Sequence, residues 1–130
     1  LDPAKRTNGE FYKTRMFRKH PCTLWMGESF GNWSWTYHMT EYLCAEFEKR
    51  FGHPHGGADS LKSLLKTRIA LSKKLSHDMT EFAQAMPDEC KVEGDAVAAY
   101  RKYYNMHKHD FATWKTETPP WWSPVITKEE

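Results

Sequence analysis

Residues 28–51, ESFGNWSWTYHMTEYLCAEFEKRF, are the stretch that decides the fold class of this chain. The larger and less polar side chains recur there every three to four residues, at Trp33, Tyr37, Thr40, Cys44, Phe47 and Phe51. This spacing puts them on one side of an α-helix, and Leu43 widens the stripe. Ser29 is suited to cap the start of the helix, and Gly52 is suited to end it. The stretch therefore predicts a long amphipathic helix.

Helical patterns recur further along the chain. Asp59 or Ser60 begins a second predicted helix that reaches about Leu75, and Asp95 caps a third over 96–107. A short helix is predicted over 80–86.

The remaining segments read differently. Phe111 and Trp114 predict one or two more helical turns, whereas residues 1–27 are expected to be irregular. Three prolines are expected to keep the tail, 116–130, extended. Because no alternating run predicts a strand, we expect a mostly α-helical, compact single domain over 1–130 with long irregular ends.

Composition and charge exclude only a few classes of protein. The chain has 130 residues and a formal net charge of +2, so a basic site must come from local clustering. Its three cysteines form no disulfide framework, which favours a reducing, intracellular setting. No apolar run approaches the roughly 20 residues that span a bilayer, and no signal peptide is visible. Because the chain begins at Leu1 instead of Met, we expect that an upstream segment has been lost.

Aromatic side chains that lie next to cations are the strongest functional signal. Rings that remain after the core is filled can stack bases, and neighbouring cations can hold phosphates. On this reasoning we expect ten residues to contact nucleic acid or a nucleotide: Lys13, Arg15, His20, Trp25, Asn32, Trp35, Arg101, Tyr103, Lys115 and Trp121.

Structural alternatives stand beside these assignments. Near a helix start, Asn32 more commonly bonds the backbone than a base. Trp35 points away from the Trp33 stripe, so it either packs on a second element or is available for stacking. The cations of residues 1–27 also fit a solvated arm, and Tyr100 to Tyr104 also fit an ordinary amphipathic helix.

Proton-transfer candidates are His20, Asp88 and Glu89, each with a structural alternative such as a turn or an ion pair. Two His-x-His pairs, at 53–55 and 107–109, lack a completing ligand at a recognisable spacing. We therefore expect no metal site and no cofactor. The sequence also has no P-loop, GxGxxG, GxSxG or HExxH motif.

Seven sequence elements together resemble an uncharacterised family of small phage proteins. They are Tyr12-Lys13, His20-Pro21 to Trp25, Asn32 to Trp35, Glu46 to Gly52 with His53 or His55, Ala85 to Glu89, Ala99 to Tyr104, and Trp114-Lys115 with Pro120-Trp121. The resemblance covers nearly the whole chain.

Proteins of this family look distantly like pyrimidine-dimer DNA glycosylases of the endonuclease V type. In those enzymes an amino-terminal amine attacks the sugar with help from a glutamate. Neither group has a counterpart here, because Leu1 and Glu28 do not match. The resemblance implies a phage DNA- or nucleotide-binding protein related to base-excision or base-modification enzymes, whose catalytic amino-terminal part is absent.

The resemblance also implies the cytoplasm of an infected cell as the location, with the virion as an alternative. A second hypothesis is a non-enzymatic protein-interaction module, either a virion component or an inhibitor of host defence, because Trp, Tyr and Arg also dominate protein interfaces. A third is a nucleotide hydrolase. We expect no membrane association.

Overall fold

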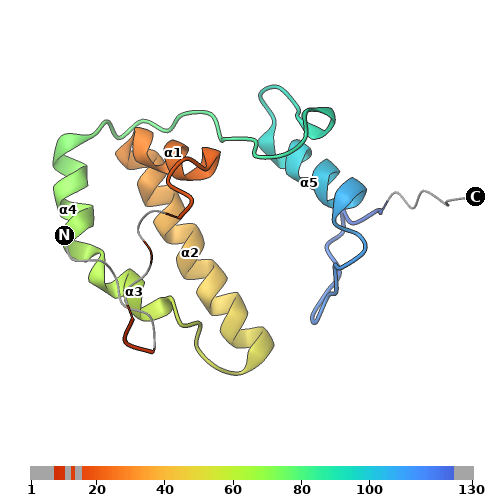
Figure 1. The fold of residues 1–130 in the computed structure, drawn as a ribbon, viewed down its shortest axis with the longest axis horizontal. Helices are drawn as coiled ribbons and strands as arrows, with labels where there is room; N and C mark the ends of the chain where they lie inside the picture. Colours follow the sequence, from red (N-terminus) through yellow and green to blue (C-terminus); the bar gives the residue numbers. More distant parts are fainter. Residues whose placement is uncertain (1–7, 11–12, 14–15, 125–130) are drawn as a thin grey trace, which may run out of the picture. The chain divides into compact units, whose positions relative to one another are not determined.

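The computed structural model describes residues 8–10, 13 and 16–124. In this part of the chain the regular elements are all helical, which confirms the predicted fold class. In chain order they are α1 (Pro21–Glu28), α2 (Phe30–Phe51), α3 (Ala58–Ser63), α4 (Leu65–Lys74), the 3₁₀ helix η1 (Asp88–Cys90) and α5 (Ala96–His107) (Figure 1). None of these helices combines the length and the apolarity that crossing a membrane requires.

The chain forms two compact units, one ending at Thr80 and the other beginning at Glu81. Helices α1 to α4 belong to the first unit, and η1 and α5 belong to the second.

Helix α2 forms over the predicted stretch, but Leu43 and Phe51 of the predicted apolar stripe are 58% and 46% exposed, so burial is confined to the first part of the helix. The Ser29 hydroxyl accepts a hydrogen bond from Asn32 N at 3.0 Å, which caps the amino-terminal end. At the other end Gly52 adopts a left-handed φ of 73°, and its N–H donates to Glu48 O. The Trp33 ring is buried and stacks on the buried ring of Tyr37, with centroids 5.5 Å apart.

Helix α1 corrects the expectation that residues 1–27 are irregular throughout. Pro21 indicated a turn, but it occupies the first turn of the helix, where its fixed φ is favourable and its missing N–H loses no bond. His20 caps this helix, because its Nδ1 accepts a hydrogen bond from Cys22 N at 3.1 Å.

The predicted helix from Asp59 or Ser60 to Leu75 is divided into α3 and α4. The division lies at Leu64, whose N–H bonds to Leu61 O three residues back while its own carbonyl accepts from Arg68 N. No glycine or proline occurs at this position, so the local sequence carries no signal for the break.

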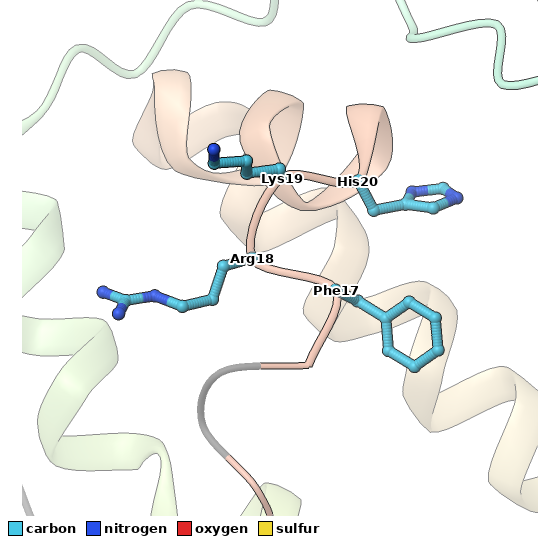
Figure 2. A pocket seen from close by; sticks show the side chains of 4 residues that line it. All are labelled: Phe17, Arg18, Lys19 and His20. Atoms are coloured by element: carbon cyan, nitrogen blue, oxygen red, sulfur yellow. The ribbon is translucent and has the colours of Figure 1, made fainter.

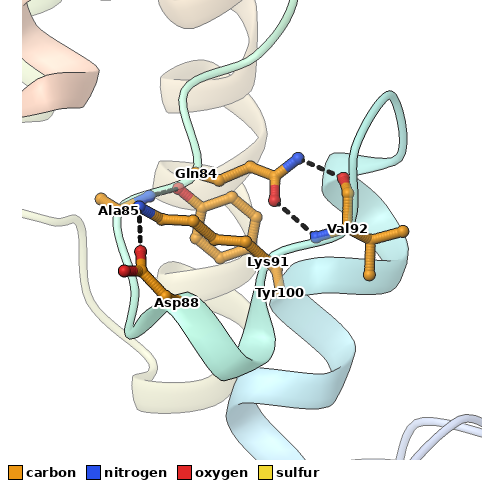
Figure 3. Close-up of polar contacts among 6 residues, drawn as sticks. All are labelled: Gln84, Ala85, Asp88, Lys91, Val92 and Tyr100. Carbon is orange, nitrogen blue, oxygen red and sulfur yellow. Dashed lines mark hydrogen bonds and ion pairs between the residues drawn. The ribbon is translucent and has the colours of Figure 1, made fainter.

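The short helix predicted over 80–86 is absent, and this prediction is wrong. The Tyr100 side chain of α5 bonds the backbone of this irregular segment instead (Figure 3). Tyr100 Oη donates to Ala83 O at 2.9 Å and accepts from Ala85 N at 3.3 Å. The Gln84 amide makes two hydrogen bonds to the backbone of Val92, at 2.6 and 2.9 Å. The two Tyr100 bonds satisfy backbone groups of this segment that a helix would pair internally, and the Gln84 side chain fixes the segment to Val92.

Helix α5 agrees with its predicted range, and the Asp95 side chain caps it by accepting from Ala98 N at 3.0 Å. Ala99 on this helix and Cys90 in η1 are fully buried. After His107 the chain makes one further turn, closed by a hydrogen bond from Ala112 N to Lys108 O. The tail is less extended than expected in its described part, because Trp122 N bonds to Pro119 O in a turn.

Candidate nucleic-acid interface

Three indoles and a phenol of the second unit form a continuous aromatic cluster. The Trp121 ring meets Trp114, Trp122 and Tyr104 edge to face, with centroids 6.5, 6.2 and 6.3 Å away. Trp114 and Trp122 also meet each other at 5.3 Å. This edge-to-face geometry stabilises the rings against one another, and Tyr104 remains exposed. We call these four residues the indole cluster.

Asn105 attaches the tail that carries Trp121 to α5. Its side-chain amide donates to Trp121 O at 3.3 Å and accepts from Ser123 N at 2.9 Å. Trp121 is consequently held beside the helix, although it lies 16 residues further along the chain than Asn105.

Two cations of α5 and its following turn lie over aromatic rings. The Arg101 guanidinium lies 5.8 Å from the Trp121 centroid. Lys108 Nζ lies 5.0 Å from the Tyr103 ring and 5.3 Å from the Phe111 ring. Tyr103 meets Tyr104 edge to face at 6.3 Å, which links both cations to the indole cluster. In the described part of the chain, no carboxylate pairs with Arg101, so its charge is available to a ligand.

Four of the ten predicted contact residues belong to this second unit. Arg101, Tyr103 and Trp121 form part of one aromatic and cationic surface, and Lys115 is exposed on the same unit. The prediction omitted Trp114, Trp122, Tyr104 and Lys108. The Trp114-Lys115 and Pro-Pro-Trp-Trp segments contain two of these residues, so a sequence signal for them existed.

The first unit contains an open hollow of about 550 Å³ lined by Phe17, Arg18, Lys19 and His20. Figure 2 shows the Phe17 and His20 rings projecting to one side and the Arg18 side chain projecting to the other. The two rings meet edge to face at 6.5 Å. Because its rings and its guanidinium diverge, this hollow is a less complete site for one nucleotide than the surface of the second unit.

Two predicted contact residues of the first unit have structural positions instead. Asn32 is 0% exposed, and its amide donates to Trp25 O and to Thr80 Oγ1 while it accepts from Thr80 N. Trp25 is 6% exposed and meets the Trp35 ring edge to face at 5.8 Å. Burial therefore removes Asn32 and Trp25 from the set of surface contacts, and the commoner backbone-bonding role of Asn32 applies.

The other predicted contacts of the first unit are on its surface. Trp35 is 40% exposed and packs against Trp25 of α1, which agrees with the predicted contact to a second element, whereas stacking on a ligand stays a prediction. Lys13 is exposed, and His20 caps α1 through Nδ1. Arg15 lies outside the described residues.

The proton-transfer candidates are divided between the two units, with His20 in the first and both carboxylates in the second. A hydrogen bond from Lys91 at 2.8 Å and the positive charge of that side chain lower the pKa of Asp88. This carboxyl is therefore ionised near neutral pH and is not an acid there. Glu89 Oε1 lies 3.1 Å from His107 Nε2, a carboxylate–imidazole pair that the sequence did not indicate.

Of the two His-x-His pairs, neither forms a site by itself. The rings of His53 and His55 pack edge to face against Phe47, at 5.3 and 4.9 Å. His107 instead joins Glu89 and Cys90, and the three potential ligand atoms all lie within 4.8 Å of one another. Burial, followed by the negative charge of Glu89, raises the pKa of the Cys90 thiol, while Lys102 opposes this effect. His107 lies far along the sequence from Glu89 and Cys90, so no ligand-spacing motif predicted this cluster.

The chain matches no protein-family model, no curated protein and no solved structure. The resemblance to small phage proteins and to glycosylases therefore stays a prediction.

Proposed function

We propose that this chain binds single-stranded nucleic acid or a nucleotide through the second unit. The observation that carries the proposal is the Arg101 guanidinium over the Trp121 ring, at the edge of the indole cluster. A guanidinium beside aromatic rings supplies both interactions that a nucleotide needs, a charge-assisted bond to phosphate and a flat surface for a base. Stacking of one base on an aromatic ring contributes about 1–3 kcal/mol.

The spacing of the cations supports a ligand longer than one nucleotide. Arg101 and Lys108 are seven residues apart on α5 and its following turn, which is about two helical turns or roughly 10 Å along the axis. Each lies over its own ring, Trp121 or Tyr103. A single nucleic-acid strand lying along α5 would therefore meet two positions, each with a cation for a phosphate and a ring for a base.

Following the resemblance, we propose a phage-encoded protein related to base-excision or base-modification enzymes, acting inside the infected cell. Among the proton-transfer candidates Glu89 has the best geometry, because its carboxylate lies 3.1 Å from His107 Nε2 and can orient that imidazole. No reaction is assigned to it, and binding is the activity that the geometry favours.

Fluorescence anisotropy with labelled single-stranded, double-stranded and mononucleotide probes tests this proposal. We expect the single strand to bind more tightly than the duplex, because stacking needs exposed base faces. Affinity should fall as salt is raised, because phosphate contacts release counterions. Absence of binding, or affinity that does not change with salt, would refute the proposal.

A second candidate function, a protein-interaction module, rests on a separate observation in the first unit. Four large side chains of α2 are exposed: Trp35, Met39, Tyr42 and Leu43. Met39 lies three residues from Tyr42 and four from Leu43, so these side chains are neighbours on the helix surface, and Tyr42 is 78% and Leu43 is 58% exposed. A purified complex with a protein partner that Leu43→Ser disrupts and that oligonucleotides do not displace would favour this function.

A further inference from the structure

We propose that Glu89, Cys90 and His107 form a zinc-binding site in the second unit. This inference does not depend on nucleic-acid binding, and it departs from the sequence-based expectation of no metal site. A Glu89 carboxylate oxygen, Cys90 Sγ and a His107 ring nitrogen all lie within 4.8 Å of one another.

Two short elements bring the three residues together. The η1 turn is closed by hydrogen bonds from Cys90 N to Pro87 O and from Lys91 N to Asp88 O, so the chain reverses within these residues. His107 is the last residue of α5, the helix that packs on η1. The Tyr103 ring lies beside the His107 ring, with centroids 5.7 Å apart.

The spacing fits a tetrahedral ion after small movements. Zinc bonds of about 2.0–2.3 Å to nitrogen, oxygen and sulfur place neighbouring ligand atoms about 3.3–3.7 Å apart. The Glu89 oxygen and His107 Nε2 already lie 3.1 Å apart. The largest separation allowed by the cluster, 4.8 Å, exceeds this range by about an ångström. Side-chain rotations that shift the exposed Glu89 and His107 donor atoms by about that distance therefore allow all three donors to bind one ion.

The ligand types select zinc over hard cations. Thiolate with imidazole is a borderline-soft donor pair, which calcium and magnesium disfavour. Carboxylate and thiolate together supply two negative charges that balance a divalent cation. The thiol proton is released to solvent when the metal–sulfur bond forms.

Burial gives the site a closed floor and an open side. Cys90 is 0% exposed, whereas the His107 and Glu89 side chains are 38% and 54% exposed. Three protein ligands then leave a fourth position toward solvent for a water molecule, as in zinc sites that act on substrates. Lys102 bonds the backbone carbonyl of Glu89 and leaves its carboxylate available.

Cobalt substitution of the full chain, without a histidine tag, tests the site directly. We expect one equivalent of Co²⁺ to give tetrahedral d–d bands and a thiolate-to-cobalt charge-transfer band. Cys90→Ser should remove the charge-transfer band, while Cys22→Ser and Cys44→Ser should retain it. His107→Gln, at a partly exposed position that tolerates substitution, should lower the affinity for zinc at least about tenfold.

Three results would overturn the site. One is a wild-type cobalt spectrum without the thiolate band, and another is loss of that band in Cys22→Ser or Cys44→Ser. The third is unchanged zinc affinity in both His107→Gln and Glu89→Gln, which would leave Glu89–His107 as an ion pair only. His53→Gln/His55→Gln serves as the control, and it should leave the charge-transfer band intact.

Discussion

The side-chain amide of Asn32 holds Thr80, 48 residues further along the chain, through two hydrogen bonds. Asn32 Nδ2 donates to Thr80 Oγ1 at 2.8 Å, and Thr80 N donates to Asn32 Oδ1 at 2.9 Å. A third bond from Nδ2 reaches Trp25 O at 2.8 Å and ties α1 to the same side chain. One buried amide thus joins the start of α2 to α1 and to the last residue of the first unit.

Asn32→Ala should destabilise the first unit by about 2–4 kcal/mol, because it removes three hydrogen bonds and leaves buried partners unsatisfied. The free energy of unfolding from urea titration measures this loss. Asn8→Ala is the matched control, since Asn8 is exposed and should change stability by less than about 0.5 kcal/mol. Equal stability of the two variants would contradict the role given to Asn32.

Two helical glycines should respond to alanine in opposite directions. A Cβ on Gly31 would lie 2.5 Å from His77 O, a backbone atom that a side-chain rotation cannot move away. Gly31→Ala should therefore destabilise the chain by about 1–3 kcal/mol, despite the better helix propensity of alanine.

Gly27→Ala is the comparison, because a Cβ on Gly27 meets nothing within 4 Å. It should leave the thermal midpoint unchanged or raise it, with a gain of up to about 1 kcal/mol. Thermal unfolding of both variants distinguishes them, and a stable Gly31→Ala protein would show that the segment at 77–78 does not pack against α2 as described.

The Asp88 carboxyl should titrate below its ordinary pKa, because Lys91 donates a hydrogen bond to it and adds positive charge. Since the folded-state pKa is the lower one, the stabilisation is present above the ordinary pKa and is lost as the pH falls through the lowered value. In NMR titration of the carboxyl carbon, Lys91→Gln should raise the Asp88 pKa toward its ordinary value. Lys62→Gln, which removes an equal charge in the first unit, should not change it. An Asp88 pKa that is equal in wild type and Lys91→Gln would disprove the coupling.

Helical periodicity and capping predicted the local structure well where the controlling bonds lie within the helix. Ser29, Gly52 and Asp95 all cap as expected, because each bonds within four residues of itself. The helix prediction for residues 80–86 was wrong because the bonds that control this segment come from distant residues. The Tyr100 hydroxyl bonds the backbone of this segment, and the Gln84 side chain bonds the backbone of Val92; no short window of sequence reveals those partners.

The candidate site was predictable by residue type more than by position. Trp121 and Arg101 stood out because rings and cations adjoin in their segments, and the structure brings these two residues together. Burial was harder to predict. Asn32 and Trp25 have the same residue chemistry as surface contacts, but the bond between the Asn32 amide and Trp25 O lies inside the first unit. The Glu89, Cys90 and His107 cluster needed the packing of η1 on α5, which no ligand-spacing motif encodes.

The most direct test of nucleic-acid binding compares Arg101→Gln and Trp121→Leu with Lys62→Gln, a control of equal charge change at an exposed position of the first unit. Affinity for a labelled single-stranded oligonucleotide is measured at several salt concentrations. We predict that Trp121→Leu weakens binding about 5- to 100-fold, that Arg101→Gln lowers the salt slope by about 1, and that Lys62→Gln matches wild type. Wild-type affinity and slope in both second-unit variants would contradict the account.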